Sequence, residues 1–124
     1  MTNPPPGSKP VGPYTPVVRA GDWLVCSGQL GLSDGKLVDG GVEAQVAQAV
    51  RNIEALLAGH GAGLDSVVKT TVFLADIGDY QPMNDAYVSA FGAHRPARSA
   101  FAVAALPLGA AVEIEAWAHS PAGH

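Results

Sequence analysis

A chain of 124 residues with a formal net charge of −4 has room for one domain of ordinary size. Hydrophobic residues make up 48% and charged residues only 15%, which is typical of a globular chain that buries part of its surface in an oligomer and excludes a disordered one. Seven basic residues without a Lys/Arg run make a nucleic-acid partner unlikely, and a single cysteine excludes an intramolecular disulfide or a multi-cysteine metal site.

Residues 1–10 contain four prolines and predict a flexible arm in front of a single domain over residues 11–120. The arm has no apolar stretch of the signal-peptide type, and no 18-residue apolar run follows it, so we expect a cytoplasmic protein without a membrane partner. Two short β-type runs come next, Val17 to Ala20 and Trp23 to Gln29. Gly21-Asp22 between them predicts a hairpin.

The middle of the chain alternates between helical and extended patterns. Apolar residues from Val42 to about His60 recur at helical spacing, and glycines end the run. The β-branched segment from Ser66 to Ala75 predicts a central strand, and Asp79 to Phe91 predicts a second helix. The apolar stripe of that second helix, which a core face explains best, consists of Tyr80, Met83, Tyr87 and Phe91.

The last third of the chain predicts two strands, Ala97 to Ala104 and Ala111 to Ala118, which simple hairpin pairing would make neighbours. The resulting order ββαβαββ indicates an α+β fold, in which two helices pack on one face of a mixed sheet. The other face of such a sheet must also be covered, which favours a subunit interface.

Alternation along the two last strands suggests what that second face carries. Glu113 and Glu115 share a side of the final strand with Trp117, and Arg98 shares a side of its neighbour with three alanines. We expect Ser99, Phe101 and Val103 to meet the helices instead. A face with one arginine, two carboxylates, a tryptophan and alanines fits an interface containing a polar pocket, although surface ion pairs would also account for the charges.

Other familiar site patterns are missing from the sequence. No histidine pair has metal-ligand spacing, and no GxSxG, GxGxxG or Walker motif occurs. Cys26 lies inside a predicted strand, where a buried and inert thiol is expected. We therefore expect no metal site.

Several segments in this order and spacing resemble the RidA/YjgF family over roughly residues 8–118. The segments are Gly12-Pro13-Tyr14-Thr15, Val25-Cys26-Ser27-Gly28-Gln29, Val67-Val68-Lys69-Thr70-Thr71-Val72-Phe73-Leu74, Asn84-Asp85-Ala86-Tyr87, Arg95-Pro96-Ala97-Arg98-Ser99, Leu106-Pro107 and Val112-Glu113-Ile114-Glu115-Ala116. The resemblance implies a chorismate-mutase-like α+β fold assembled as a homotrimer, with active sites in clefts between subunits. It also implies hydrolysis of 2-iminobutanoate and 2-iminopropanoate to 2-keto acids and ammonia, without a metal or organic cofactor.

By the same resemblance, Arg98 would bind the substrate carboxylate through parallel charge-assisted hydrogen bonds, and Glu113 would hold and polarise the attacking water. Tyr14, Ser27 and Asn84 match positions that line the family's pocket, and the backbone around Cys26 to Gly28 and at Ala100 would add polar contacts. Ala100 departs from the cysteine frequent in relatives, which puts any thiol-dependent behaviour in doubt.

Three questions stay open at this stage. Hairpin pairing of the last two strands separates Arg98 from Glu113 by roughly 13 Å. Three explanations are open: a strand register that differs from the expected one, a substrate and a water molecule that together span the gap, or a site to which two subunits contribute one residue each. A non-catalytic protein that binds small carboxylates or a partner protein is the alternative function. A ribonuclease or translation inhibitor fits the acidic composition less well.

Overall fold

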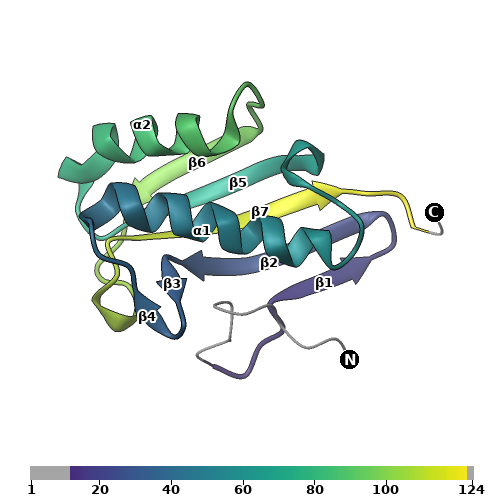
Figure 1. The fold of residues 1–124 in the computed structure, drawn as a ribbon, viewed down its shortest axis with the longest axis horizontal. Helices are drawn as coiled ribbons and strands as arrows, with labels where there is room; N and C mark the ends of the chain where they lie inside the picture. The colour runs from purple at the N-terminus through teal and green to yellow at the C-terminus, as the bar shows by residue number, and fades with distance from the viewer. Residues whose placement is uncertain (1–11, 123–124) are drawn as a thin grey trace.

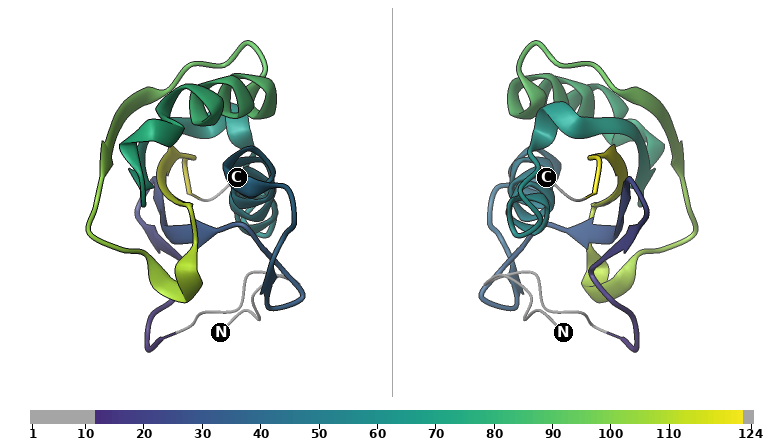
Figure 2. Two further views of the ribbon diagram at one scale, coloured as in Figure 1. Left: turned by 90° about the vertical axis from the view of Figure 1, so that its left-hand side faces the viewer. Right: turned by 90° about the vertical axis from the view of Figure 1, so that its right-hand side faces the viewer.

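A computed structural model describes residues 12–122 of the chain. A five-stranded sheet has the strand order β1-β2-β7-β5-β6, and a separate two-stranded sheet pairs β3 with β4. Both helices lie on one face of the large sheet, which curves around them (Figures 1 and 2). This confirms the predicted α+β architecture.

The first two strands form the predicted hairpin. β1 (Val17–Ala20) pairs antiparallel with β2 (Trp23–Leu30), and Ala20 lies opposite Trp23 so that Gly21 and Asp22 form a two-residue loop. Gly21 adopts a φ of 59°, in the left-handed region that such tight turns need.

The central elements also agree with the prediction to within two residues at their ends. α1 (Gly41–Ala58) is followed by β5 (Val67–Leu74) and α2 (Tyr80–Phe91), with single 3₁₀ turns in front of β5 and α2. Along α1 the apolar stripe faces the sheet and is buried: Val42, Val46, Ala49, Val50, Ile53, Leu56 and Leu57.

The last two strands are correct in position but wrong in partner. β7 (Val112–His119) lies between β2 and β5 and is antiparallel to both, whereas β6 (Ala97–Ala102) is an edge strand parallel to β5. The strand–helix–strand connection from β5 through α2 to β6 explains this, because such a crossover brings its two strands into parallel alignment. The hairpin expected from their short connection does not form.

A small hairpin between β2 and α1 was not predicted. β3 (Leu32–Ser33) pairs with β4 (Lys36–Leu37) around Asp34 and Gly35, whose φ values of 53° and 79° are typical of a type I′ turn. The buried Asn52 amide of α1 donates hydrogen bonds to the carbonyl oxygens of Leu30 (3.2 Å) and Leu32 (3.0 Å), and so fixes the bend between β2 and β3.

The two faces of the large sheet differ sharply. Under the helices, Val112, Ile114 and Ala116 of β7 are completely buried in the main core. The other face exposes aromatic rings: Trp23 lies edge-on to Trp117, with 6.4 Å between ring centroids, and Phe73 is likewise edge-on to Phe101 at 5.4 Å. Within residues 12–122, no helix combines the length and hydropathy needed to cross a membrane.

Candidate active site

Arg98 lies on the helix side of the sheet, which corrects the prediction. In the parallel β5–β6 pair it stands opposite Thr70, and Thr70 is buried beneath α2, where it shares a hydrogen bond of 2.7 Å with the Tyr87 hydroxyl. Ser99 and Phe101, which were expected to meet the helices, face the other way. The apolar Phe101 is tolerated there because it packs against Phe73.

The Arg98 guanidinium is held by side chains of α2. Nη2 donates a hydrogen bond to the Tyr80 hydroxyl (3.2 Å), and Nη1 points at the Met83 sulfur (3.8 Å). The guanidinium carbon also lies 5.0 Å from the Tyr87 ring centre and 5.8 Å from that of Tyr80, within the range of a cation–π interaction. All of these partners are neutral, so the described residues leave the positive charge of Arg98 without a carboxylate.

Asn84 lies on α2 between Tyr80 and Tyr87, at helical positions that share a face. Its Oδ1 atom is buried and has no hydrogen-bond partner among residues 12–122. An orphaned buried acceptor is uncommon in a native fold and indicates a missing donor. Ala100, next to Arg98 on the same side of β6, packs against the core. Two predicted site residues, Arg98 and Asn84, are therefore close to the same helix face.

Glu113 lies on the opposite, helix-free side of the sheet, between the buried Val112 and Ile114. Its carboxyl group packs onto the backbone of Gly28 in β2: a Cβ atom at position 28 would come within 2.7 Å of Glu113 Cδ and 2.8 Å of Oε2. The pairing of β2 with β7 shifts register between Cys26 and Gln29, an irregularity of the kind often found beside active sites.

Burial raises the pKa of Glu113 above its usual value, and the negative charge of Glu115 on the same face of β7 raises it further. A carboxylate with a raised pKa is a better proton acceptor than an ordinary one near neutral pH. Glu113 therefore has the properties required of a general base.

Ser27 precedes Gly28 in β2, and hydrogen bonds link Ser27 to the segment that carries Tyr14, so both residues are connected through the chain to the Gly28–Glu113 contact. The Ser27 hydroxyl donates to the Thr15 carbonyl (2.7 Å), and its amide donates to the Pro16 carbonyl (2.8 Å). These bonds fix the segment that carries Tyr14, whose side chain is 40% exposed. Ser27 thus anchors this segment next to the Gly28–Glu113 contact.

Arg98 and Glu113 do not form one site within a single chain. Phe73 of β5 lies opposite both Glu113 and Phe101, so the two charged residues are two strands and three residues apart, or roughly 14 Å, and on opposite faces. Of the three explanations for their distance, a different strand register is found, because β6 pairs with β5 and not with β7. This register brings Arg98 and Glu113 no closer. The predicted cleft on the helix-free side lacks its arginine.

Two further residues were not predicted as part of these groups. Tyr80 was assigned to the core stripe of α2, yet 39% of it is exposed and its hydroxyl contacts Arg98. Gly28 was expected to contribute only backbone polar contacts, and its close approach to the Glu113 carboxyl group was not predicted. A glycine inside a strand is a recognised signal of close approach by another group, and it could have identified this position.

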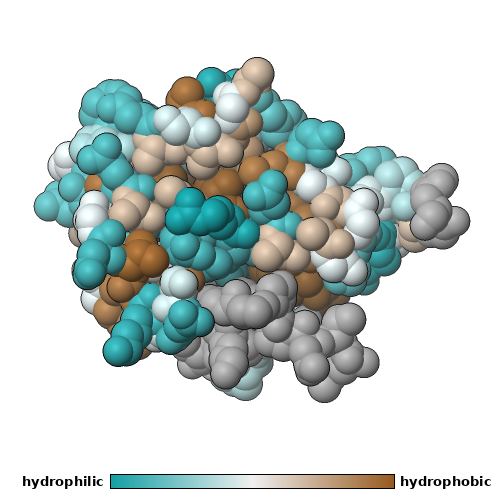
Figure 3. Space-filling view, viewed as in Figure 1, coloured by the Kyte–Doolittle hydropathy of each residue, from teal (hydrophilic) through white to brown (hydrophobic). Residues whose placement is uncertain are grey.

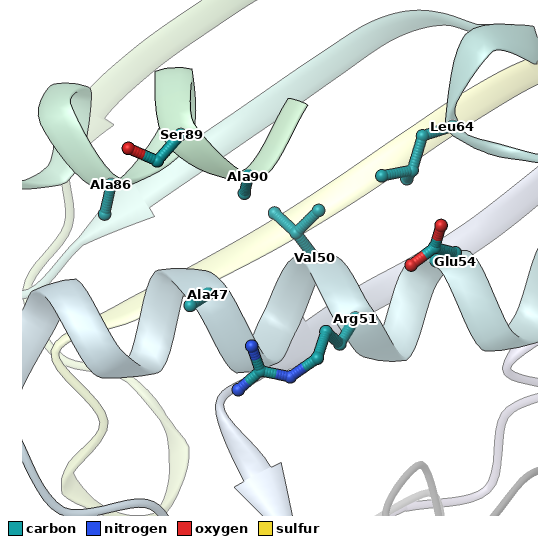
Figure 4. A pocket seen from close by; sticks show the side chains of 8 residues that line it. All are labelled: Ala47, Val50, Arg51, Glu54, Leu64, Ala86, Ser89 and Ala90. Carbon is teal, nitrogen blue, oxygen red and sulfur yellow. The ribbon is translucent and has the colours of Figure 1, made fainter. Parts of the chain in front are cut away.

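Other candidate sites carry less chemistry. Cys26 is buried, and burial raises the pKa of its thiol to about 12, as expected for an inert cysteine. Among residues 12–122, no three His, Cys, Asp or Glu side chains gather closely enough to hold a metal ion. The helix side of the molecule shows hydrophobic residues among hydrophilic ones (Figure 3). A groove of about 380 Å³ runs between α1 and α2, and Val50 and Leu64 are among the side chains that line it (Figure 4). It contains none of the predicted site residues.

Comparison with known proteins gives consistent matches over almost the whole chain. The family described as endoribonuclease L-PSP matches residues 5–120. A mouse protein named 2-iminobutanoate/2-iminopropanoate deaminase is 46% identical over 108 residues, which cover 86% of this chain and 80% of the mouse protein. In the crystal structure of a protein described as a putative endoribonuclease L-PSP from Entamoeba histolytica, 95% of that chain superposes on 94% of this one with a TM-score of 0.89 and 41% identity. RidA from the Antarctic bacterium Psychrobacter sp. PAMC 21119 gives a TM-score of 0.87 at 37% identity, covering 96% of both chains.

Proposed function

The chain belongs to the endoribonuclease L-PSP family, which includes the RidA proteins, and from this membership we propose that it hydrolyses reactive 2-imino acids to 2-keto acids and ammonia. The substrates are small imines of the 2-iminobutanoate and 2-iminopropanoate type, the class in the name of the mouse relative. The reaction needs no metal or organic cofactor, because an imine already reacts with water.

The observation that carries the proposal is the neutral surrounding of Arg98. Its guanidinium is partly buried among Tyr80, Met83 and Tyr87 and has no carboxylate partner within residues 12–122. A planar guanidinium can bind a carboxylate through two parallel hydrogen bonds, each of which contributes about 1.5–3 kcal/mol. The orphaned Oδ1 of Asn84 is suited to accept an N–H group, such as that of the imine.

Glu113 acts on water in this proposal. Its carboxylate accepts a proton as the water oxygen forms a bond to the imine carbon, and the C=N π electrons move to nitrogen. With the imine protonated on nitrogen, this addition gives a neutral carbinolamine. Glu113 then returns its proton to that nitrogen, the C–N bond breaks as the hydroxyl oxygen forms the C=O bond of the keto acid, and the hydroxyl proton passes to the Glu113 carboxylate, so that ammonia leaves. The raised pKa of Glu113 supports these transfers, since the group must gain and lose a proton near neutral pH.

A homotrimer would combine the two groups across a subunit boundary. Arg98 lies on the edge strand β6 and Glu113 on the helix-free face, so a second copy seated on that face could bring its own Arg98 to Glu113. The exposed rings of Trp23, Trp117 and Phe101 on this face, with the half-buried Phe73 beside Phe101, support such an association. Tyr14, Ser27 and Glu113 would come from one subunit, and Arg98, Asn84 and Ala100 from its neighbour.

The test is release of 2-ketobutanoate from 2-iminobutanoate, generated in place by a threonine dehydratase. We expect the wild type to exceed the buffer rate and Arg98→Ala to fall to it. Arg51→Ala is the matched control, because Arg51 is an exposed arginine of α1 whose guanidinium, within residues 12–122, donates a hydrogen bond to Gln48 of the same helix. Equal rates for wild type, Arg98→Ala and buffer would refute the proposal. Tight carboxylate binding without turnover would favour the non-catalytic alternative.

A further inference from the structure

The hydroxyl of Tyr80, at the start of α2, contacts Arg98. Tyr80, Met83 and Tyr87 are three and four residues apart on α2 and therefore share the helix face that meets β6. They surround the guanidinium with two aromatic rings, one sulfur atom and one phenol oxygen. Only the phenol oxygen is a strong hydrogen-bond acceptor.

The two tyrosines have different tasks. Tyr87 is 3% exposed, and its hydroxyl is already paired with Thr70 at 2.7 Å, so it offers Arg98 only its ring. Tyr80 is 39% exposed, and its hydroxyl receives the Nη2–H bond at 3.2 Å. Removing the Tyr80 hydroxyl would leave the core intact and would free one nitrogen of the guanidinium.

We propose that Tyr80 is a positioning residue, whose hydroxyl holds the Arg98 guanidinium in the orientation that binds a planar carboxylate. This inference rests on the proposed function, because it concerns the same site. An arginine side chain has several freely rotating bonds, and fixing its fork in advance reduces the entropy lost when a carboxylate binds. The Tyr80 hydroxyl performs this task without competing for charge, as a carboxylate partner would.

The test compares Tyr80→Phe with Gln81→Ala. Tyr80→Phe keeps the ring and removes the hydroxyl. Gln81→Ala removes an equally exposed hydrogen bond, from Gln81 to Asp85 at 3.0 Å, on the same turn of α2 but away from Arg98. We expect Tyr80→Phe to weaken binding of 2-ketobutanoate by about 3- to 10-fold and to raise KM by the same factor with kcat unchanged, since the guanidinium is no longer held in its binding orientation. Gln81→Ala should change neither value.

A second measurement does not depend on turnover. Nuclear magnetic resonance of the Arg98 side chain should show distinct Nη–H signals in the wild type and averaged signals in Tyr80→Phe, because the fork is then free to rotate. A merely structural role for Tyr80 would lower the melting temperature without changing these signals. Unchanged binding, KM and Nη–H signals in a folded Tyr80→Phe protein would overturn the inference, as would a wild type that binds no 2-ketobutanoate.

The outcomes also separate this inference from the proposed function. If the wild type hydrolyses no imine but Tyr80→Phe still weakens 2-ketobutanoate binding, the proposed reaction fails and the positioning role stands. If the wild type is an active deaminase and Tyr80→Phe behaves like Gln81→Ala, the reaction stands and the positioning role is wrong.

Discussion

The Arg98 group and the Glu113 group lie on opposite faces of one sheet and are held in place by different means. Arg98 is fixed by side chains of a helix, which reach its guanidinium from Tyr80, Met83 and Tyr87. Glu113 is fixed by backbone, because its carboxyl group packs against Gly28 where β2 departs from regular pairing. The Arg98 guanidinium is thus held by side chains, which can change rotamer, and the Glu113 carboxyl group by strand backbone, which cannot.

This difference matches what the two groups must do in the proposed reaction. A carboxylate-binding arginine benefits from neutral partners, which orient it and leave its charge available. A base benefits from partial desolvation and a neighbouring negative charge, both of which make Glu113 a stronger proton acceptor. Arg98 could bind the substrate but has no base beside it, and Glu113 could act as the base but has no carboxylate-binding residue beside it. In the proposed reaction, the two therefore form one site only if chains associate.

The largest effect on activity is expected from removing Arg98 in one variant and Glu113 in another. Glu113→Gln should lower kcat by about 10²–10⁴-fold, since general-base catalysis is lost, and Arg98→Ala should be inactive as well. If each site takes Arg98 from one subunit and Glu113 from the next, trimers refolded from an equal mixture of the two variants should regain activity in about one quarter of their sites. Mixing without refolding is the control, and recovery no greater than that of either variant alone would contradict a shared site.

A smaller effect should follow from disturbing the backbone contact alone. In Gly28→Ala, the added methyl group would lie 2.7 Å from Glu113 Cδ, so the carboxyl group must move. We expect kcat to fall by about 10- to 100-fold with little change in KM, because a displacement of about 1 Å misplaces the base and not the carboxylate site. In a Glu113→Gln background the same substitution should cost almost nothing further, and a full additional loss there would mean that Gly28 acts elsewhere.

The smallest effect concerns stability and pH. Burial and Glu115 raise the folded-state pKa of Glu113 above its ordinary value of 4.5, so the folded protein holds that proton more tightly than the unfolded chain does. The resulting stabilisation is complete below about pH 4.5 and is lost as pH rises through the raised value. At pH 7, Glu113→Gln should therefore be slightly more stable than the wild type, because solvent screens this partly exposed charge and keeps the effect small.

Urea denaturation at pH 4 and pH 8, with equal protein concentrations for both variants, measures this difference. The advantage of Glu113→Gln should be present at pH 8 and absent at pH 4. An advantage that is larger at pH 4 would show that the pKa of Glu113 is lowered by folding, and would weaken its assignment as the base.

The sequence predicted the elements well because their signals are local. The apolar period of residues 42–58, the β-branched run in β5 and the Gly21-Asp22 turn each determine structure within a few residues. The position of β7 between β2 and β5 could not be read in this way, since alternation along a strand says nothing about its neighbours. The parallel pairing of β6 with β5 could have been predicted from the sequence, because a strand–helix–strand unit commonly makes its two strands parallel.

The site residues stay predictions, and the geometry expected for them was wrong in one respect, because Arg98 and Glu113 lie on opposite faces of the sheet. Alternation correctly separated Arg98 and Ala100 from Ser99 and Phe101, but hydropathy assigned the wrong pair to the helices. On an edge strand such as β6, an aromatic ring can point away from the core when another ring lies beside it, as Phe73 does for Phe101. The roles of all six predicted site residues come from the family resemblance and remain predictions: Tyr14, Ser27, Asn84, Arg98, Ala100 and Glu113.

The buried thiol of Cys26 has a practical consequence for testing whether chains associate. It is the chain's single cysteine, it is 2% exposed, and its pKa of about 12 makes it a poor target for maleimide dyes. A cysteine placed at Val88, which is 45% exposed on α2, would then carry a fluorophore without any need to replace the native residue. Donor- and acceptor-labelled chains could report subunit exchange in real time by energy transfer.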